Sequence, residues 1–484
     1  MNYLILSRLL GLFFAFFGLS MLPAAAWSLV YGEHRALLAF GGSIAVCEAL
    51  GGGLWWIGRR AEGRMYSREA LAVVGLGWLI AAALGGLPYW FSGMFSNPVD
   101  AYFESMSGFT TTGASMLADI EVQDRSLIFW RSFTHWLGGM GIIVLFISIL
   151  PYLGAGGKQL FKHESPGPDP RGLAPKIRDT AAILWKIYVG MTLGLTVLLM
   201  AQGLSFYEAL CHTFGTVATG GFSTRNASVA AYNGLGIEIT ILVFMVLAGS
   251  NFSLFFAMLG GDKKALFKDP EWRSYMLILA IATAAVTANL WLESAVEGLG
   301  TALRHASFTV VSIMTTTGFV TADFEQWPHF SKTVLLLLMF VGGSAGSTGG
   351  GLKVIRLMIL WKVAWARIHK AYAPRTVQTM KIGADVISPE IQHTVLVFFL
   401  LFLSAFTLGT LAMTALGMDL VSALSAVAAT LNNVGPGFGA VGPTTTFAEV
   451  PTAGKAVLSL LMGIGRIELF AILVLFSPGF WRRA

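Results

Sequence analysis

Residues 307–323 have the sequence SFTVVSIMTTTGFVTAD, in which three threonines and a glycine interrupt an apolar stretch. Glycine weakens a helix, so this composition does not suit the middle of a long apolar helix. Three related stretches occur elsewhere in the chain: FTTTGAS (109–115), TVATGGFST (216–224) and NNVGPGFG (432–439). The fold depends on what these four stretches do.

The composition indicates a membrane protein. Of 484 residues, 55% are hydrophobic and 12% are charged, and the mean hydropathy is +0.70. A soluble domain has roughly 25% charged residues. The net charge of +6 would suit an anionic partner such as nucleic acid, but the placement of the charges indicates membrane topology instead. We therefore expect contact with membrane lipids and none with nucleic acid.

Ten windows of about 20 apolar residues are long enough to cross a bilayer as helices. They lie at 5–30, 37–58, 71–92, 127–152, 181–202, 235–260, 273–293, 332–362, 391–416 and 454–477. The window at 332–362 is interrupted by VGGSAGSTGGG (341–351), which excludes an ordinary continuous helix there. The expected fold is thus an all-α polytopic membrane protein with about ten transmembrane helices.

The positive charges predict the orientation of these spans. Of the 32 Lys and Arg residues, 24 lie on the side that carries both ends of the chain. Positively charged loops face the cytoplasm. We therefore expect a multi-pass protein with both termini cytoplasmic.

The connections on the opposite side form an internal repeat. Each predicted unit contains a helix, a short re-entrant helix, a Thr/Gly loop and a second helix. The glycines taken as equivalent, Gly113, Gly220, Gly318 and Gly435, are separated by 107, 98 and 117 residues. The predicted domains are an extra two-helix domain at 1–68 and four pore repeats at 69–155, 176–262, 270–368 and 388–480.

Small residues recur in the second helix of each unit. They are LGGMG (137–141), LAGSN (247–251), VGGSAGS (341–347) and MGIGR (462–466). Small residues let membrane helices approach closely, which is our interpretation outside the third unit. In the third unit the small residues continue for ten positions (342–351), more than one packing face needs. Because each glycine costs a helix roughly 1 kcal/mol relative to alanine, we expect a flexible intramembrane loop there.

The four Thr/Gly loops predict an ion filter. Irregular backbone at membrane depth is tolerated where it is buried in protein or lines a water-filled cavity. Short helices can direct their partly negative C-terminal ends to one axis, where backbone carbonyls coordinate a dehydrated cation. Threonine hydroxyls would coordinate the cation or brace the loop. The predicted walls are Thr110, Thr111, Thr112 and Gly113; Val217, Ala218, Thr219, Gly220 and Gly221; Thr315, Thr316, Thr317 and Gly318; and Asn432, Asn433, Val434 and Gly435. The alternative for any single copy is an ordinary turn or kink.

These four segments, together with the two extra N-terminal spans, resemble the TrkH/KtrB/HKT superfamily of potassium uptake channels and transporters, most closely its bacterial TrkH branch. The resemblance covers the whole chain. It implies one pseudo-fourfold pore in each subunit of a homodimer, in the bacterial inner membrane. It also implies a TrkA-like cytoplasmic nucleotide-binding ring as partner, and K⁺ as the bound, transported ion without an organic cofactor. Glycine in the first loop, here Gly113, goes with potassium preference in that superfamily, whereas the fourth loop departs from its threonine pattern.

The resemblance also implies a gate below the filter. Its predicted residues are Gly342, Gly343, Ser344, Ala345, Gly346, Ser347, Thr348, Gly349, Gly350, Gly351 and Arg466. An intramembrane arginine is costly and usually faces a cavity or a partner. Arg466 would repel cations or hydrogen-bond the loop carbonyls; the alternative is a structural pair remote from permeation. The basic stretch from Lys353 to Lys381 is either a docking surface for the ring or ordinary cytoplasmic charge.

Six acidic residues lie near the predicted outer ends: Asp100, Glu104, Glu208, Asp323, Asp419 and Glu449. They would concentrate cations at the mouth or serve as solvated loop charges. The favoured function is a gated, channel-like potassium pore driven by the membrane potential. The alternative is an H⁺- or Na⁺-coupled symporter, which would need carboxylates at midplane depth; Glu468 is the one obvious candidate. The chain lacks a convergent set of nucleophile, base and metal ligands, so no enzyme is expected.

Overall fold

The computed structural model describes residues 1–61, 66–141, 177–375, 379–383, 385–467 and 469–481, and this part of the chain is mostly helical. Its regular strands, β1 (Lys381–Ile382) and β2 (Asp385–Val386), form a small antiparallel hairpin. Six helices in it are long and apolar enough to cross a membrane, and a seventh span results if one bent pair is counted. The expected all-α multi-pass membrane fold is confirmed.

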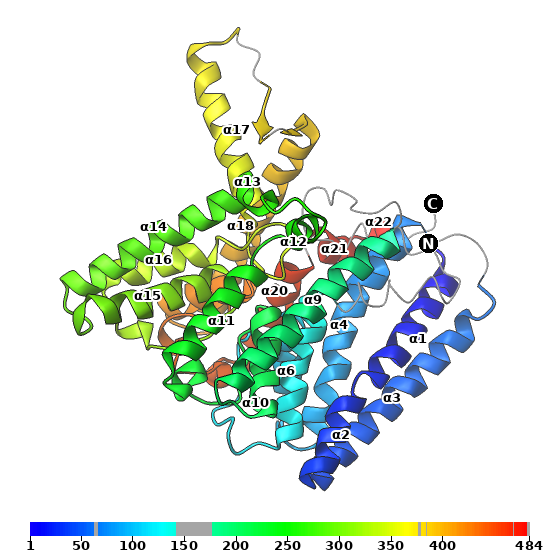
Figure 1. Cartoon of the computed structure of the whole chain (residues 1–484). Coiled ribbons are helices and arrows are strands. Elements are labelled where there is room, and N and C mark those ends of the chain that lie inside the picture. The colour runs from blue at the N-terminus through cyan, green and yellow to red at the C-terminus, as the bar shows by residue number, and fades with distance from the viewer. Residues whose placement is uncertain (62–65, 142–176, 376–378, 384, 468, 482–484) are drawn as a thin grey trace.

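The N-terminal helices form a hairpin along one side of the molecule (Figure 1, blue). They are α1 (Tyr3–Leu19), α2 (Leu22–Tyr31) and α3 (His34–Gly58). Glycines let α1 and α3 meet backbone to backbone: a methyl group on Gly58 would lie 2.5 Å from the Leu4 carbonyl oxygen. The hairpin packs against α4 (Ser67–Phe91). These helices fall within the predicted 1–68 segment, whose status as a separate domain stays a prediction.

Four long helices are each followed by a short one. The pairs are α4 and α5 (Pro98–Phe109), α9 (Ile177–Ala201) and α10 (Phe206–Val217), α14 (Pro270–Leu292) and α15 (Gly298–Met314), and α18 (Pro389–Ala415) and α19 (Leu420–Leu431). Three short helices begin at side-chain caps, from Asn97, Ser205 and Asp419. Such caps satisfy backbone N–H groups that lack partners in the first turn.

The helices after the four loops end early. They are α6 (Arg125–Gly139), α11 (Leu235–Ala248), α16 (His329–Met339) and α20 (Thr452–Arg466). All four end at, or immediately before, the clusters of small residues. The window predicted at 235–260 is not one straight helix, because α11 and α12 (Phe252–Leu259) meet at a 93° bend. The spans predicted at 127–152 and 454–477 are also interrupted, after Gly139 and Arg466; residues 142–152 lie outside the described residues.

Close packing explains both the small residues and the helix ends. A methyl group on Gly138 would lie 1.8 Å from the Phe109 carbonyl oxygen, and one on Gly465 would lie 2.0 Å from that of Leu431. The ends of α6 and α20 therefore press against the last turns of α5 and α19. The interpretation as close-packing positions is supported, and the structure adds that the helix stops there.

The helix α17 (Val354–Tyr372) projects from the helical body together with the β-hairpin and the start of α18 (Figure 1). Buried Ile359, Ile382 and Val395 hold these elements together. The remaining short elements are α13 (Ala265–Lys268), α21 (Leu469–Leu473), α22 (Pro478–Trp481), η2 (Ser228–Tyr232), η3 (Phe324–Gln326), η4 (Gly439–Val441), η5 (Phe447–Glu449) and η6 (Val474–Phe476). The Tyr3 hydroxyl donates to the Trp481 carbonyl at 2.6 Å, so the first and last described helices lie at one end of the molecule.

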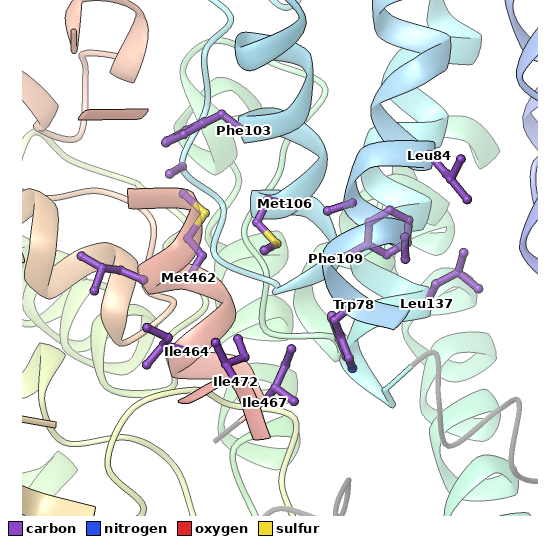
Figure 2. Packing of buried hydrophobic residues seen from close by; sticks show 14 of the residues in the cluster. Trp78, Leu84, Phe103, Met106, Phe109, Leu137, Met462, Ile464, Ile467 and Ile472 are labelled. Atoms are coloured by element: carbon purple, nitrogen blue, oxygen red, sulfur yellow. The ribbon is translucent and has the colours of Figure 1, made fainter. Parts of the chain in front are cut away.

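The main hydrophobic core surrounds the short helix α5 (Figure 2). Met106 lies on the side of α5 that contacts Met462 of α20, and Phe109 lies toward α4 and α6. Both Met106 and Phe109 are fully buried. This apolar packing fixes where the C-terminal end of α5 points, and hence where its loop begins.

Candidate ion pathway

The four short helices all end in the same turn. In each, the N–H two residues past the helix cap bonds to a carbonyl five residues back: Thr112 to Ser107, Gly220 to Gly215, Thr317 to Ser312 and Val434 to Ala429, at 2.7–2.9 Å. This is the Schellman arrangement, which needs a left-handed residue after the cap. Here that residue is not glycine but Thr111, Thr219, Thr316 or Asn433, with φ between 53° and 59°. A β-branched residue in this conformation is strained, and such strain concentrates at functional sites.

A glycine with positive φ follows two residues later in every loop. The four are Gly113 (φ 80°), Gly221 (77°), Gly318 (80°) and Gly435 (103°). The predicted equivalence of Gly220 is therefore wrong by one residue. Gly220 occupies the place of Thr112, and Val217 is the last residue of α10 rather than part of the irregular loop.

The loops touch one another in a closed cycle. A methyl group on each left-handed glycine would meet the next loop's carbonyl oxygen: Gly113 against Gly220 (2.2 Å), Gly221 against Thr317 (2.0 Å), Gly318 against Val434 (2.2 Å) and Gly435 against Thr112 (2.7 Å). Four segments up to about 320 residues apart in sequence thus surround one axis. Glycine is required both by the dihedral angle and by the lack of room for a side chain.

The threonine hydroxyls brace the loops. Thr110 Oγ1 donates to Met106 O at 2.6 Å and lies 2.7 Å from Thr112 Oγ1. Thr315 makes the same pair of contacts in the third loop. Asn433 Nδ2 donates to Thr112 Oγ1 at 2.9 Å, which ties the fourth loop to the first. Of the two roles expected for these side chains, the contacts support bracing.

His135, for which sequence analysis predicted no role, connects the end of α5 to the second loop. Its Nδ1 lies 2.7 Å from the Gly108 carbonyl, and its Nε2 accepts from Phe222 N at 3.2 Å. These contacts fix a neutral ring with the proton on Nδ1. The ring also stacks on Phe222 with centroids 4.1 Å apart. A lone histidine in an apolar helix carries no sequence signal that distinguishes this role from ordinary packing.

Polar side chains of the short helices hold the segment that follows each loop. Ser312 Oγ donates to Phe319 O at 2.7 Å, and Ser425 Oγ donates to Phe438 O at 2.9 Å. His212 Nε2 lies 2.9 Å from Ser223 Oγ, and Glu104 accepts from Met116 N at 2.6 Å. Sequence reasoning missed these braces, although polar residues on otherwise apolar helices were a visible signal.

The Gly-rich segment leaves the helix at Met339 and reaches α17 as an irregular loop, as predicted. The tip of this loop, residues 348–350, lies against the ends of three short helices. Thr348 Oγ1 donates to Val217 O at 3.0 Å, and Gly350 N donates to Thr316 Oγ1 at 2.7 Å. A methyl group on Gly350 would lie 2.5 Å from Asn432 O. The tip is thus packed under the second, third and fourth loops.

Arg466 holds this tip from the end of α20. Its Nη1 donates to Thr348 O at 2.6 Å, and its Nη2 donates to the carbonyls of Gly138 and Gly139 at 2.7 and 2.9 Å. Of the two roles expected within the gate, the contacts support hydrogen bonding to the loop. A location remote from the loops is excluded.

Two charged residues contact this loop in ways that sequence analysis did not predict. Lys353 is 4% exposed and its Nζ donates to Gly349 O, so its predicted place on a docking surface is wrong. Glu271, at the start of α14, accepts from Ala345 N and Ile355 N at 2.8 and 3.0 Å. In the sequence Asp269-Pro270-Glu271, the glutamate cannot be told from an ordinary first-turn acid. Glu468, the carboxylate considered for symport, lies outside the described residues.

Three of the six acids near the predicted mouth are paired with cations. Asp100 lies 2.8 Å from Lys455, Glu104 2.5 Å from Arg131, and Glu208 2.7 Å from Arg225. Their charge is largely neutralised, so they do not support the predicted cation concentration.

The other three acids differ. Asp323 and Asp419 cap η3 and α19, while Glu449 is exposed. Hydrogen bonds from Ser422 lower the pKa of the Asp419 carboxyl. Asp419 therefore stays ionised at the start of a short helix, where negative charge is stabilised.

A multi-pass helical fold with four irregular loops closed around one axis defines a membrane transport protein for small ions. A family model described as a cation transport protein, TrkH, matches residues 38–483. The chain therefore belongs to the TrkH family. A transport family, rather than an enzyme family, agrees with the expectation from sequence.

Individual relatives match over their whole length. The chain is 39% identical to the Trk system potassium uptake protein TrkH of Salmonella typhimurium and 38% identical to that of Escherichia coli K12, covering 100% of each. It superimposes on the crystal structure of the potassium transporter TrkH from Vibrio parahaemolyticus with a TM-score of 0.89, at 35% identity and 100% coverage of both chains.

Proposed function

We propose that this chain takes up potassium through a selective, gated pore across the bacterial inner membrane, driven by the membrane potential. The closed cycle of four loops is the observation that carries the proposal. Its strained turns converge on one axis, where backbone oxygens can replace the hydration shell of K⁺. Three further loop oxygens, Thr111 Oγ1, Asn432 Oδ1 and Asn433 Oδ1, are buried without a hydrogen-bond partner in the described chain. The potassium uptake named for the relatives supports the same ion.

The gate in this proposal is the Gly-rich loop with Arg466. The tip of the loop packs under three of the four loops. Arg466 bonds to the Thr348 carbonyl of the tip and to the Gly138 and Gly139 carbonyls of α6, and the Thr348 hydroxyl lies within hydrogen-bond distance of the Val217 and Ala248 carbonyls. An ion leaving the four loops would therefore meet this loop, so conduction requires it to move.

The proposed assembly is a homodimer regulated by a TrkA-like cytoplasmic nucleotide-binding ring. The projecting α17 supports a docking role, because it leaves the helical body and carries exposed basic residues such as Lys362 and Lys370. Lys353, buried on the Gly-rich loop at its base, would transmit the position of α17 to the gate.

A coupled symporter is the alternative. In the described chain, the buried ionisable groups nearest the four loops already have structural partners: Glu104 bonds to Arg131, and His135 bonds to Gly108 and Phe222. These contacts favour the channel-like mechanism.

Flux into liposomes tests the proposal. Purified protein should take up ⁸⁶Rb⁺ under an imposed potential, without H⁺ or Na⁺ gradients, and external K⁺ should compete. Uptake that requires an H⁺ or Na⁺ gradient would favour the symporter. Absence of any Rb⁺ or K⁺ uptake would contradict both mechanisms.

A further inference from the structure

One carboxylate joins the two ends of the Gly-rich loop, residues 342–345 and 352–355, which we call the neck of the loop. Glu271 Oε1 accepts from Ala345 N at 2.8 Å and from Ile355 N at 3.0 Å, two amides ten residues apart. Gly342 N to Leu352 O (2.8 Å) and Val354 N to Gly343 O (3.2 Å) close the same neck from backbone to backbone. The Glu271 side chain thus bridges the two sides of the neck, and it is 6% exposed.

The helix α17 needs this external acid. Its first turn contains no acidic residue, and its cap, Lys353, makes no side-chain capping bond. The N–H groups of a first turn lack partners within the helix, and Glu271 accepts one of them, from Ile355. By contrast, α14 is capped by Asp269, which accepts from Trp272 N at 2.8 Å. Glu271 is therefore available to α17.

We propose that Glu271 is a positioning residue that keeps the Gly-rich loop across the ion pathway, and that loss of its bonds to Ala345 and Ile355 lets the loop leave. The inference rests on the proposed function. Arg466 and Thr348 hold the tip of the loop, and Glu271 holds the neck together with two backbone bonds, so losing the Glu271 bonds shifts the balance toward a displaced loop. Because Ile355 and Val354 belong to α17, a displacement of that projecting helix would act on the Glu271 contact and on the Val354–Gly343 backbone bond together.

The test compares Glu271 with a matched carboxylate elsewhere. Glu69 is 3% exposed and also accepts two backbone N–H groups, from Asn2 at 2.7 Å and Tyr66 at 3.0 Å. It lies at the start of α4, away from the Gly-rich loop. Glu271→Ala and Glu69→Ala each remove a buried acceptor and should lower thermal stability alike, so stability alone does not separate the roles.

Ion flux measured without the regulatory partner separates the role of Glu271 from that of Glu69. Glu271→Ala should raise ⁸⁶Rb⁺ leak about tenfold, the order of effect expected when two hydrogen bonds to one buried acceptor are lost. Glu271→Gln retains one acceptor oxygen and should raise the leak less. Glu69→Ala should leave it unchanged. The preference for Rb⁺ over Na⁺ should stay at the wild-type value in all variants, because the four loops are intact.

Hydrogen exchange gives a readout that does not depend on transport. In the full-length protein in detergent, Glu271→Ala should speed exchange in peptides covering 341–355, and Glu69→Ala should not. Wild-type leak together with unchanged exchange at 341–355 would overturn the role of Glu271. Faster exchange with no Rb⁺ flux in any variant would contradict the proposed function while leaving the positioning contact established.

Discussion

At the scale of single residues, the identity of the loop glycines is set by their neighbours. Gly113 adopts φ 80°, and the Gly220 carbonyl fills the space where its side chain would project. Each of the four left-handed glycines is in this way limited by a loop from another part of the chain. One substitution therefore displaces two loops, which explains why a minor chemical change should alter ion selection.

Replacing Gly113 with serine tests this coupling. The new Cβ would lie 2.2 Å from Gly220 O, so the second loop must move outward and the coordination suited to K⁺ should be lost. We expect Na⁺ to compete with ⁸⁶Rb⁺ uptake roughly tenfold better than in the wild type, about 1.4 kcal/mol of discrimination. Gly194→Ser on α9, where nothing lies within 4 Å, is the control. Equal Na⁺ competition in both variants would refute the coupling.

The buried pair Glu104–Arg131 should matter for stability. Both side chains are at most 2% exposed, so removing one partner leaves an uncompensated buried charge. Arg131→Ala should cost about 3–5 kcal/mol, measured as a lowered unfolding temperature in detergent. Arg225→Ala removes a guanidinium that is 42% exposed and should cost at most about 1 kcal/mol. Similar losses in the two variants would contradict the assigned difference in burial.

The sequence was sufficient for locating the loop residues, but not for their register. TTTG has one glycine, whereas TVATGG offers two, and the choice between Gly220 and Gly221 depends on where α10 ends. That end is fixed by tertiary packing around Val217 and Ala218. The roles of His135 and Glu271 were equally inaccessible, because their partners are backbone atoms far away in sequence.

At the scale of elements, each helix after a loop stops where it meets a short helix. The ten consecutive small residues at 342–351 predicted one of these helix breaks from sequence. The clusters at 137–141 and 247–251 contain too few small residues to exclude a helix. Their breaks follow from contacts: a methyl on Gly139 would lie 2.7 Å from Ala218 Cβ, and one on Gly249 would lie 3.1 Å from Thr315 Cγ2.

Arg466 connects two of these breaks, so its removal should loosen the gate. Arg466→Ala deletes three hydrogen bonds to Thr348, Gly138 and Gly139. We expect partner-independent ⁸⁶Rb⁺ leak to rise roughly tenfold or more in Arg466→Ala. Arg466→Lys offers fewer directed donors, so its leak should lie between those of the wild type and Arg466→Ala. Arg304→Ala, which breaks a 2.6 Å pair with Glu238 away from the loop, should not raise it. Wild-type leak in Arg466→Ala at equal expression would argue against a gating role.

At the scale of the whole molecule, the fold agrees with one part of the predicted topology, because the two described chain ends lie together, while their orientation stays a prediction. The basic loops and both chain ends were predicted on one side from sequence alone, and the contact between Tyr3 and Trp481 places α1 and α22 at one end. What the sequence could not supply was the depth of each helix. Apolar windows of similar length became a straight span in α18 and a bent pair in α11 and α12, because hydropathy does not record tertiary breaks.

Thiol labelling tests the predicted orientation. The native cysteines, Cys47 and Cys211, are buried and should give little background. Val122→Cys lies in the exposed connection before α6, and Lys370→Cys lies on the exposed surface of α17. A membrane-impermeant maleimide should label Val122→Cys in intact cells but Lys370→Cys only after lysis. Because the positive-inside bias places the basic α17 in the cytoplasm, the reverse pattern would invert the whole molecule and turn the Gly-rich loop toward the outside.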